Sequence, residues 1–324
     1  MNKNFDLTLL SEGQIWGAGK EEQLYVMKKY GVKAAVTDLC ILTGCYITNK
    51  NHINEDNSLS GRTGRFWTRS KWDRSRTCEL YNPYDVCVVD KNGEWDDRLR
   101  FDRLCAVRPV LHSSLIYSQI FSNRVIGYNG TLEVEYGEYP QWAAESKMQQ
   151  ILELEYSKGL NKTGESYTFD SSDLNDYNAE FIPVIYDVYE YQGRKYIRAR
   201  VNYHFEHYDT REITLSNNKE YKNGQYVWIE VSPVKWLIDE KTHTLISKYG
   251  LVSGLAFQFR WKRMKNSCVR CDSPYNGDFK KTDMYEYLNT YMSRDLFQSL
   301  PFVYDQDLNS KEKGKIKKLL FFRF

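Results

Sequence analysis

The stretch Gly64-Arg-Phe-Trp-Thr-Arg-Ser70 opens a run, ending at Leu111, in which tryptophan and arginine recur between turns and short apolar segments. Asp85 to Asp90 has the length and apolar content of a buried strand, and Asn92-Gly93 after it is a turn signal. Leu104 to Leu111 predicts another strand, whose proline places one end at a sheet edge or strand terminus. The run therefore predicts short antiparallel strands separated by loops.

The tryptophans and arginines of this run have two interpretations. They can form the core of a loop-rich domain, with arginines bonded to backbone carbonyls, or they can stack and make forked hydrogen bonds to a ligand. We interpret Trp67 and Arg108 as core residues, and the loops 73–84 and 91–100 as a binding surface. The residues predicted to bind a ligand are Trp72, Arg74, Arg76, Tyr81, Trp95, Arg98 and Arg100.

The composition is that of a globular protein with an unusual number of aromatic residues. The chain has 324 residues, of which 41 % are hydrophobic and 27 % charged. The 45 Lys and Arg nearly balance the 43 Asp and Glu, so nucleic acid is not an expected partner. No segment reaches the roughly 20 apolar residues of a membrane span, and no apolar signal peptide begins the chain. We therefore expect synthesis in a cytoplasm. The 26 tyrosines are typical either of half-buried strands or of interfaces.

The rest of the chain predicts a mixture of helices and strands. Helices are expected over residues 20–30, after a cap at Thr37 or Asp38, over 141–156 and over 282–297. Strands are expected over residues 182–191 and 197–205, joined by a hairpin turn at Gln192-Gly193, and over 226–231, 235–238 and 244–247. Residues 158–180 are polar and predict a loop.

The residue types that carry chemistry form no complete constellation in the sequence. Cys268-Val-Arg-Cys271 has the spacing of a zinc half-site, but no second half-site lies near it in sequence. His204 and His207 flank Glu206 and are more typical of a solvated strand end than of a ligand set. A metal- or thiol-dependent enzyme would rest on these two pairs alone. We therefore predict no catalytic residue, no metal site and no cofactor.

The last residues form a basic run followed by an apolar end, and such a surface must be covered. It can pack on its own domain or dock on a partner as an added strand or peptide. The residues predicted to contact a partner are Leu319, Leu320, Phe321, Phe322 and Phe324.

Two sets of short motifs resemble C-type-lectin-related domains of gut bacteria and their phages, which share their broad fold with formylglycine-generating enzymes and retroelement variable proteins. The C-terminal half of such domains is similar to residues 66–70, the turn at 88–93 and Ala106-Val-Arg-Pro109-Val-Leu. The N-terminal half is similar to Gly137-Glu-Tyr-Pro-Gln141, 233–238, 245–248 and 287–289. The halves occur in reversed order, so the chain holds either two diverged copies or a rearranged pair.

The resemblance implies an α+β, C-type-lectin-like fold of loop-rich mixed domains, with short antiparallel strands and a few amphipathic helices. We expect a lectin-like half at 1–128, a second related domain at 129–304 and a tail at 305–324. Cys78, Cys87 and Cys105 do not reproduce the cysteines of the formylglycine-generating enzymes, so no activity carries over. The expected function is a non-enzymatic phage-type virion or surface-display protein that contacts other protein subunits and enters a phage particle. The alternative is a carbohydrate- or peptide-binding module of a bacterial host, with glycan as the partner.

Overall fold

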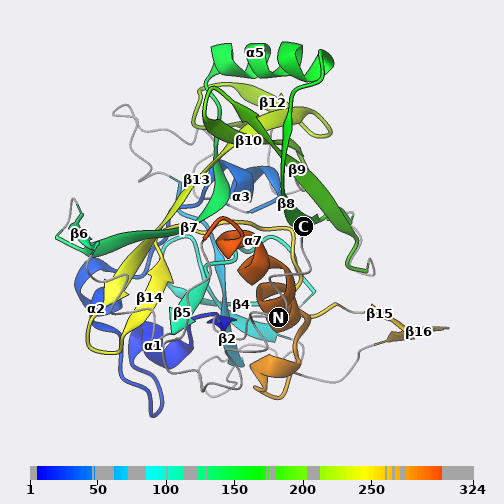
Figure 1. Cartoon of the computed structure of the whole chain (residues 1–324). Coiled ribbons are helices and arrows are strands. Elements are labelled where there is room, and N and C mark those ends of the chain that lie inside the picture. The colour runs from blue at the N-terminus through cyan, green and yellow to red at the C-terminus, as the bar shows by residue number, and fades with distance from the viewer. Residues whose placement is uncertain are drawn as a thin grey trace, which may run out of the picture.

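A computed structural model describes residues 6–45, 47, 62–71, 85–99, 101–112, 123–127, 130–172, 174, 180–202, 212–259, 261–264, 267–270 and 275–300. The fold is mixed α+β, in which short helices surround sheets whose named strands all pair antiparallel (Figure 1). This confirms the predicted α+β class, with mostly antiparallel sheets and a few helices. No helix of the described ranges is both long and apolar enough to cross a membrane.

The main sheet has nine strands, and it draws on both sides of the boundary predicted near residue 128. Its strands run in the order β1-β5-β14-β13-β10-β9-β8, while β7 pairs with β13 and β6 pairs with β7. Their bounds are β1 Leu7–Thr8, β5 Val110–His112, β6 Val125–Ile126, β7 Leu132–Ala143, β8 Lys162–Asp170, β9 Pro183–Tyr191, β10 Arg194–Arg200, β13 Tyr226–Asp239 and β14 Thr244–Ser247. Strand β5 pairs with β1 on one side and with β14 on the other, so the two parts of the chain share one sheet.

Three smaller sheets accompany it. They are formed by β2 Phe66–Lys71, β3 Asp85–Val89 and β4 Trp95–Leu99; by β11 Glu212–Thr214 and β12 Glu220–Lys222; and by β15 Trp261–Met264 and β16 Ser267–Arg270. Figure 1 shows the β15–β16 hairpin extending away from the rest of the molecule. Cys268 lies on β16 opposite Arg263, while Cys271 falls outside the described residues.

Strand β13 corrects one prediction. The sequence predicts two strands, at 226–231 and 235–238, whereas the structure has one strand of 14 residues. Pro233 cannot donate a backbone hydrogen bond, and it lies at an irregularity of the pairing with β7, where the register shifts before Lys235. The strand therefore continues past its proline at a bulge. The predicted pairing of residues 244–247 with the end of this strand is confirmed.

The β9–β10 hairpin is confirmed, and its neighbour β8 is a second correction. Gln192 and Gly193 both have positive φ, as a two-residue turn of type I′ requires. Residues 162–170, predicted as part of a loop, form the strand β8 paired with β9. Its polar residues mislead because burial is confined to Tyr167, Thr168 and Phe169 near the end of the strand, while its first part is exposed or half-buried.

The helices match the predictions in part, since α1 was not predicted and two others begin later than expected. They are α1 Glu12–Trp16, α2 Tyr25–Tyr30, α3 Asp38–Leu42, α5 Ser146–Ser157, α6 Asp283–Tyr287 and α7 Ser293–Phe297, with a 3-10 turn η4 Phe279–Lys281 and a π-helical turn η5 Leu288–Met292. The Thr37 side chain caps α3, as predicted. Helix α2 is shorter than expected, and α5 begins only at Ser146 because residues 141–143 complete β7.

The continuous helical segment α6–η5–α7 lies against both end strands of the main sheet. At strand β1, Asn289 accepts from the Leu7 amide at 2.9 Å and donates to the Leu7 carbonyl at 3.0 Å. At strand β8, Gln298 makes the same two bonds to Ser166, at 3.2 and 3.1 Å, and Asp295 accepts from the Thr168 amide at 2.7 Å. These side chains pair with strand edges as a neighbouring strand would.

A buried ion pair joins distant parts of the chain. Asp38 and Arg62 are both fully buried and bonded to each other. The Asp38 carboxylate also accepts from the Ala143 amide at 2.7 Å, from the Ser216 amide at 3.0 Å and from the Ser216 hydroxyl. One carboxylate therefore holds α3, β7 and the β11–β12 turn together.

The core confirms two assignments made from the tryptophan–arginine run. Trp67 is fully buried and donates from Nε1 to the Leu255 carbonyl at 3.2 Å. Arg108 is also buried and donates to the Ser247 carbonyl at 2.9 Å, and its burial lowers its pKa to about 10. Both residues are framework.

Candidate functional site

The predicted ligand residues fall mostly outside the described part of the chain. Trp72, Arg74, Arg76, Tyr81 and Arg100 lie there, as do the tail residues Leu319, Leu320, Phe321, Phe322 and Phe324, and also His204 and His207. The structure describes only Trp95 and Arg98 from this set, both on β4.

Strand β4 separates the two described members of that set. Successive side chains of a strand point to opposite faces, so Trp95 and Asp97 share one face while Asp96 and Arg98 share the other. The Arg98 Nη2 atom lies 3.0 Å from Asp96 Oδ2, which Arg65 Nη2 also approaches at 3.5 Å. Trp95 and Arg98 therefore cannot act on one ligand from the same face of β4.

Two carboxyl groups lie close together on this sheet, those of Asp85 on β3 and Asp97 on β4. Burial, and next the hydrogen bond and charge of Asp97 on the adjacent strand, together raise the pKa of Asp85 to about 7, because two carboxylates that close are not both ionised. The sequence pair Asp96-Asp97 is thus split between an arginine contact and a carboxyl contact. Among the described residues, no group of three or more His, Cys, Asp or Glu side chains could hold a metal ion.

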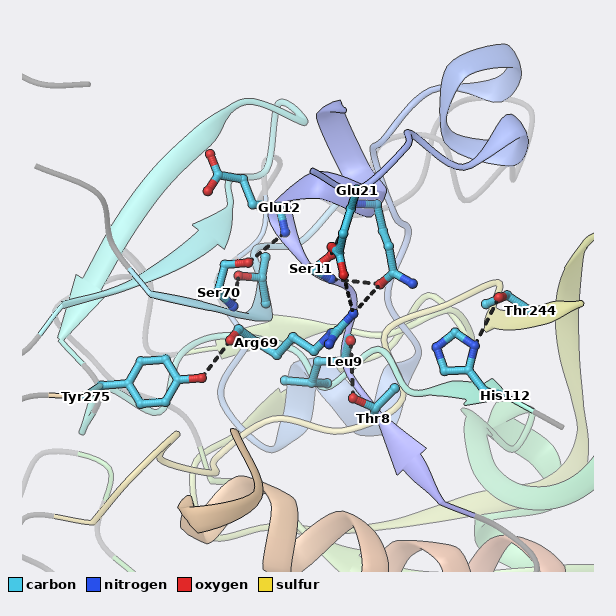
Figure 2. A network of polar contacts seen from close by, with 12 residues as sticks. Thr8, Leu9, Ser11, Glu12, Glu21, Arg69, Ser70, His112, Thr244 and Tyr275 are labelled. Carbon is cyan, nitrogen blue, oxygen red and sulfur yellow. Dashed lines mark hydrogen bonds and ion pairs between the residues drawn. The ribbon is translucent and has the colours of Figure 1, made fainter. Parts of the chain in front are cut away.

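A larger polar network lies where α1, β2 and β5 meet (Figure 2). Ser11 caps α1, accepting from the Gln14 amide and donating to Glu21. The Arg69 Nη2 atom contacts Gln14 Oε1 and Glu21 Oε1, each at 3.3 Å. On the neighbouring residue, the Ser70 hydroxyl accepts from the Glu12 amide at 2.8 Å. Ser11 is therefore engaged in a cap and an acid contact, which are structural roles.

His112 extends this network from the end of β5. Its Nδ1 lies 3.1 Å from the Thr244 hydroxyl oxygen, which lies 2.8 Å from that of Thr242. The Thr242 hydroxyl donates to Asp239 Oδ1 at 2.9 Å. Although part of the ring is exposed, burial of the rest and the nearby Arg69 lower the pKa of His112, while Glu21 raises it. The imidazole is therefore neutral at pH 7.

A second exposed feature lies where α5 covers the end of the sheet, uppermost in Figure 1. The Arg198 guanidinium lies 3.9 Å from the Tyr226 ring centroid and 5.0 Å from that of Tyr156. Glu153 holds it with two hydrogen bonds, of 3.0 and 2.8 Å. Tyr226 is 50 % exposed and Tyr156 is 39 % exposed. We call Tyr156, Arg198 and Tyr226 the aromatic–arginine face.

Behind this face lies a small apolar cluster of its own. Tyr156 packs edge-on against Tyr189 and Trp228, with ring centroids 5.5 and 5.7 Å apart. Trp228 donates from Nε1 to Glu153 at 3.0 Å, so one carboxylate holds both the tryptophan and the exposed arginine. The face is therefore built on rigid supports.

Sequence reasoning missed these residues. Arg69 lies two residues after the core residue Trp67, and its backbone is bonded within the fold while its guanidinium reaches the polar network. Arg198 lies on the polar face of the predicted hairpin strand, and that alternation is the signal that could have marked it. His112, Tyr156 and Tyr226 carry no motif.

Comparisons with family models, curated proteins and solved structures each find no match to this chain.

Proposed function

We propose that the chain is a non-enzymatic subunit of a phage-type virion or surface assembly, built on a C-type-lectin-like fold and acting through protein contacts. The observation that carries this proposal is the aromatic–arginine face. Tyrosine and arginine are enriched at the energetically dominant positions of protein interfaces. Here Glu153 fixes Arg198 between two exposed rings, so a partner would immobilise few side chains on binding.

The sheet order supports the lectin-like part of the proposal. Strand β5 ends the motif that resembles the C-terminal half of such domains, and β14 carries a motif of the N-terminal half. The two strands pair directly, with Leu111 opposite Leu245. Two motif sets in reversed chain order thus meet in one sheet, which favours a rearranged pair over two separate copies.

The test measures assembly directly. Sedimentation over a range of concentrations should detect species heavier than one chain, and Tyr226→Ala should weaken their association by at least tenfold. Tyr25→Ala is the matched control, because Tyr25 is 54 % exposed but lies away from the aromatic–arginine face, on α2. The subunit should also occur in purified particles from the producing cell. A protein that is monomeric at every concentration and absent from particles would contradict the proposal.

One observation favours the alternative of a carbohydrate- or peptide-binding module. The side chain of Trp95 is partly exposed at the start of β4, directly after the tight turn at Asp90–Glu94. An aromatic ring in that position can stack on a sugar. Saturable binding on a glycan array that Trp95→Ala abolishes, and that the equally half-buried Trp142→Ala leaves intact, would place this function above the first.

A further inference from the structure

The guanidinium of Arg69 is well positioned and incompletely used. Its backbone is fixed, because the Arg69 amide donates to the Leu10 carbonyl at 2.9 Å and the Arg69 carbonyl accepts from the Tyr275 hydroxyl at 2.7 Å. Both side-chain contacts, to Gln14 and Glu21, are made through Nη2 at 3.3 Å. Hydrogen bonds between an arginine and a carboxylate are ordinarily about 2.7–2.9 Å long. The Nε atom is buried and has no hydrogen-bond partner in the described residues.

A chain of hydroxyl groups holds one of the two ring nitrogens of His112. The Thr242 hydroxyl donates to Asp239 Oδ1 at 2.9 Å. The Thr242 and Thr244 hydroxyl oxygens lie 2.8 Å apart, and the Thr244 oxygen lies 3.1 Å from Nδ1 of His112. Nδ1 therefore has a partner in this chain, whereas no described residue hydrogen-bonds to Nε2, which is the ring nitrogen left to meet a ligand.

The two groups converge on the same exposed surface. Figure 2 shows the ring of His112 with its other nitrogen directed toward the side on which Arg69 and Glu21 lie. The charged groups that act on His112 are Arg69 from β2, Glu21 from the connection between α1 and α2, and Asp239 through the threonines. Glu21 is exposed, with about half of its side-chain surface accessible, 48 %.

We propose that Arg69 and His112 form a binding site for a carboxylate-bearing ligand, for which Glu21 is the internal competitor. One carboxylate oxygen accepts from the accessible end of the Arg69 guanidinium, whose side chain is 30 % exposed, and the other accepts from Nε2–H of a protonated His112. Each ligand that binds a neutral His112 therefore brings one proton from solvent to the imidazole, and no covalent bond changes. The site lies apart from the aromatic–arginine face, so its test is independent of the proposed assembly.

The proposal predicts a pH dependence of affinity. A bound carboxylate stabilises the charged imidazole, so it raises the pKa of His112, and binding tightens as the pH falls through the histidine range. A tenfold gain in affinity between about pH 7.5 and about pH 5.5 corresponds to a rise of about one unit in that pKa.

The experiment uses the full chain with nitrogen-15-labelled histidine, titrated with three probes and followed by the imidazole shifts. The probes are glucuronate, a short peptide whose only carboxylate is its C-terminus, and a C-terminally amidated peptide that carries one aspartate. The blank is the first peptide with its C-terminus amidated, which has no carboxylate. The probe bound most tightly identifies the source of the carboxylate. The signal of His112 is assigned by its loss in His112→Gln, and in the wild-type protein it should shift as the probe is added.

Four variants decide the outcome. Arg69→Gln, which keeps both backbone hydrogen bonds, should lose at least tenfold in affinity, and Glu21→Gln should gain several-fold. Glu22→Gln is the matched control, because its carboxylate pairs with Lys241 on the surface, and it should change nothing. His112→Gln should remove the pH dependence. No binding of any probe, unchanged binding in Arg69→Gln, or no gain in Glu21→Gln would overturn the proposal.

Discussion

Replacing Asp38 by alanine should destabilise the whole protein, because this one carboxylate holds three separate segments. The substitution leaves Arg62 buried without its counter-charge and removes the acceptor for the amides of Ala143 and Ser216. Breaking a buried ion pair from one side costs about 3–5 kcal/mol. Each orphaned buried amide adds about 1–3 kcal/mol. Since such terms overlap, we expect a loss of about 4–6 kcal/mol, which is comparable to the whole stability of many domains.

Urea unfolding, followed both by tryptophan fluorescence and by far-ultraviolet circular dichroism, measures this loss. The two signals should give one shared transition in the wild-type protein, since both parts of the chain contribute to one sheet. Asp38→Asn keeps an acceptor oxygen and should lose less. Glu22→Ala, which breaks the exposed pair with Lys241, should cost under about 1 kcal/mol. The reasoning would be refuted if Asp38→Ala cost less than about 1 kcal/mol, or if it moved only one of two separate transitions.

Three further substitutions test the helical segment and the core it covers. Asn289→Ala orphans both backbone groups of buried Leu7 and should cost about 2–4 kcal/mol, with faster hydrogen exchange at that amide; slow, unchanged exchange would argue against the pairing. Burial raises the pKa of Asp295 to about 6 from 3.8, so the folded state binds this proton more tightly and the free energy of unfolding falls by about 3 kcal/mol as the pH rises from about 4 to about 6. Asp295→Asn should abolish that slope, and an identical profile in both proteins would disprove the assignment. Gly137→Ala should lower the free energy of unfolding by about 1–3 kcal/mol in chemical denaturation. The φ angle of Gly137 is 70°, and a Cβ there would lie 2.6 Å from a backbone oxygen of α7. An unchanged free energy of unfolding would show that the helix can move.

The local signals in the sequence predict local structure well. The Thr37 cap, the Gln192-Gly193 turn and the apolar residues of 85–89 each act over a few residues, and each is found as expected. Edge strand β8 was missed because only three of its nine residues are buried and its pairing partner β9 lies across a long connection. Strand β13 was divided in two because a proline in a paired strand is tolerated only where the partner strand bulges, and a sequence does not reveal its partner.

The candidate sites were harder to predict, for the same reason. Arg69, Glu21 and His112 lie far apart in sequence, and only the meeting of α1, β2 and β5 brings them together. The tryptophan–arginine run indicated that its members act together, yet alternation along β4 places Trp95 and Arg98 on opposite faces. Two residues that are close in sequence on one strand therefore lie on different surfaces of the sheet.

The helical segment that lies against both end strands has a consequence for how the protein is made. The Leu7 backbone groups bond to Asn289, which lies 282 residues later in the sequence. During synthesis the N-terminal strand leaves the ribosome long before its final partner exists, and contacts of such separation are slow to form. Until residue 289 has been translated, the Leu7 backbone groups therefore lack both of their hydrogen bonds to Asn289, so completion of this edge of the sheet should be among the last steps of folding.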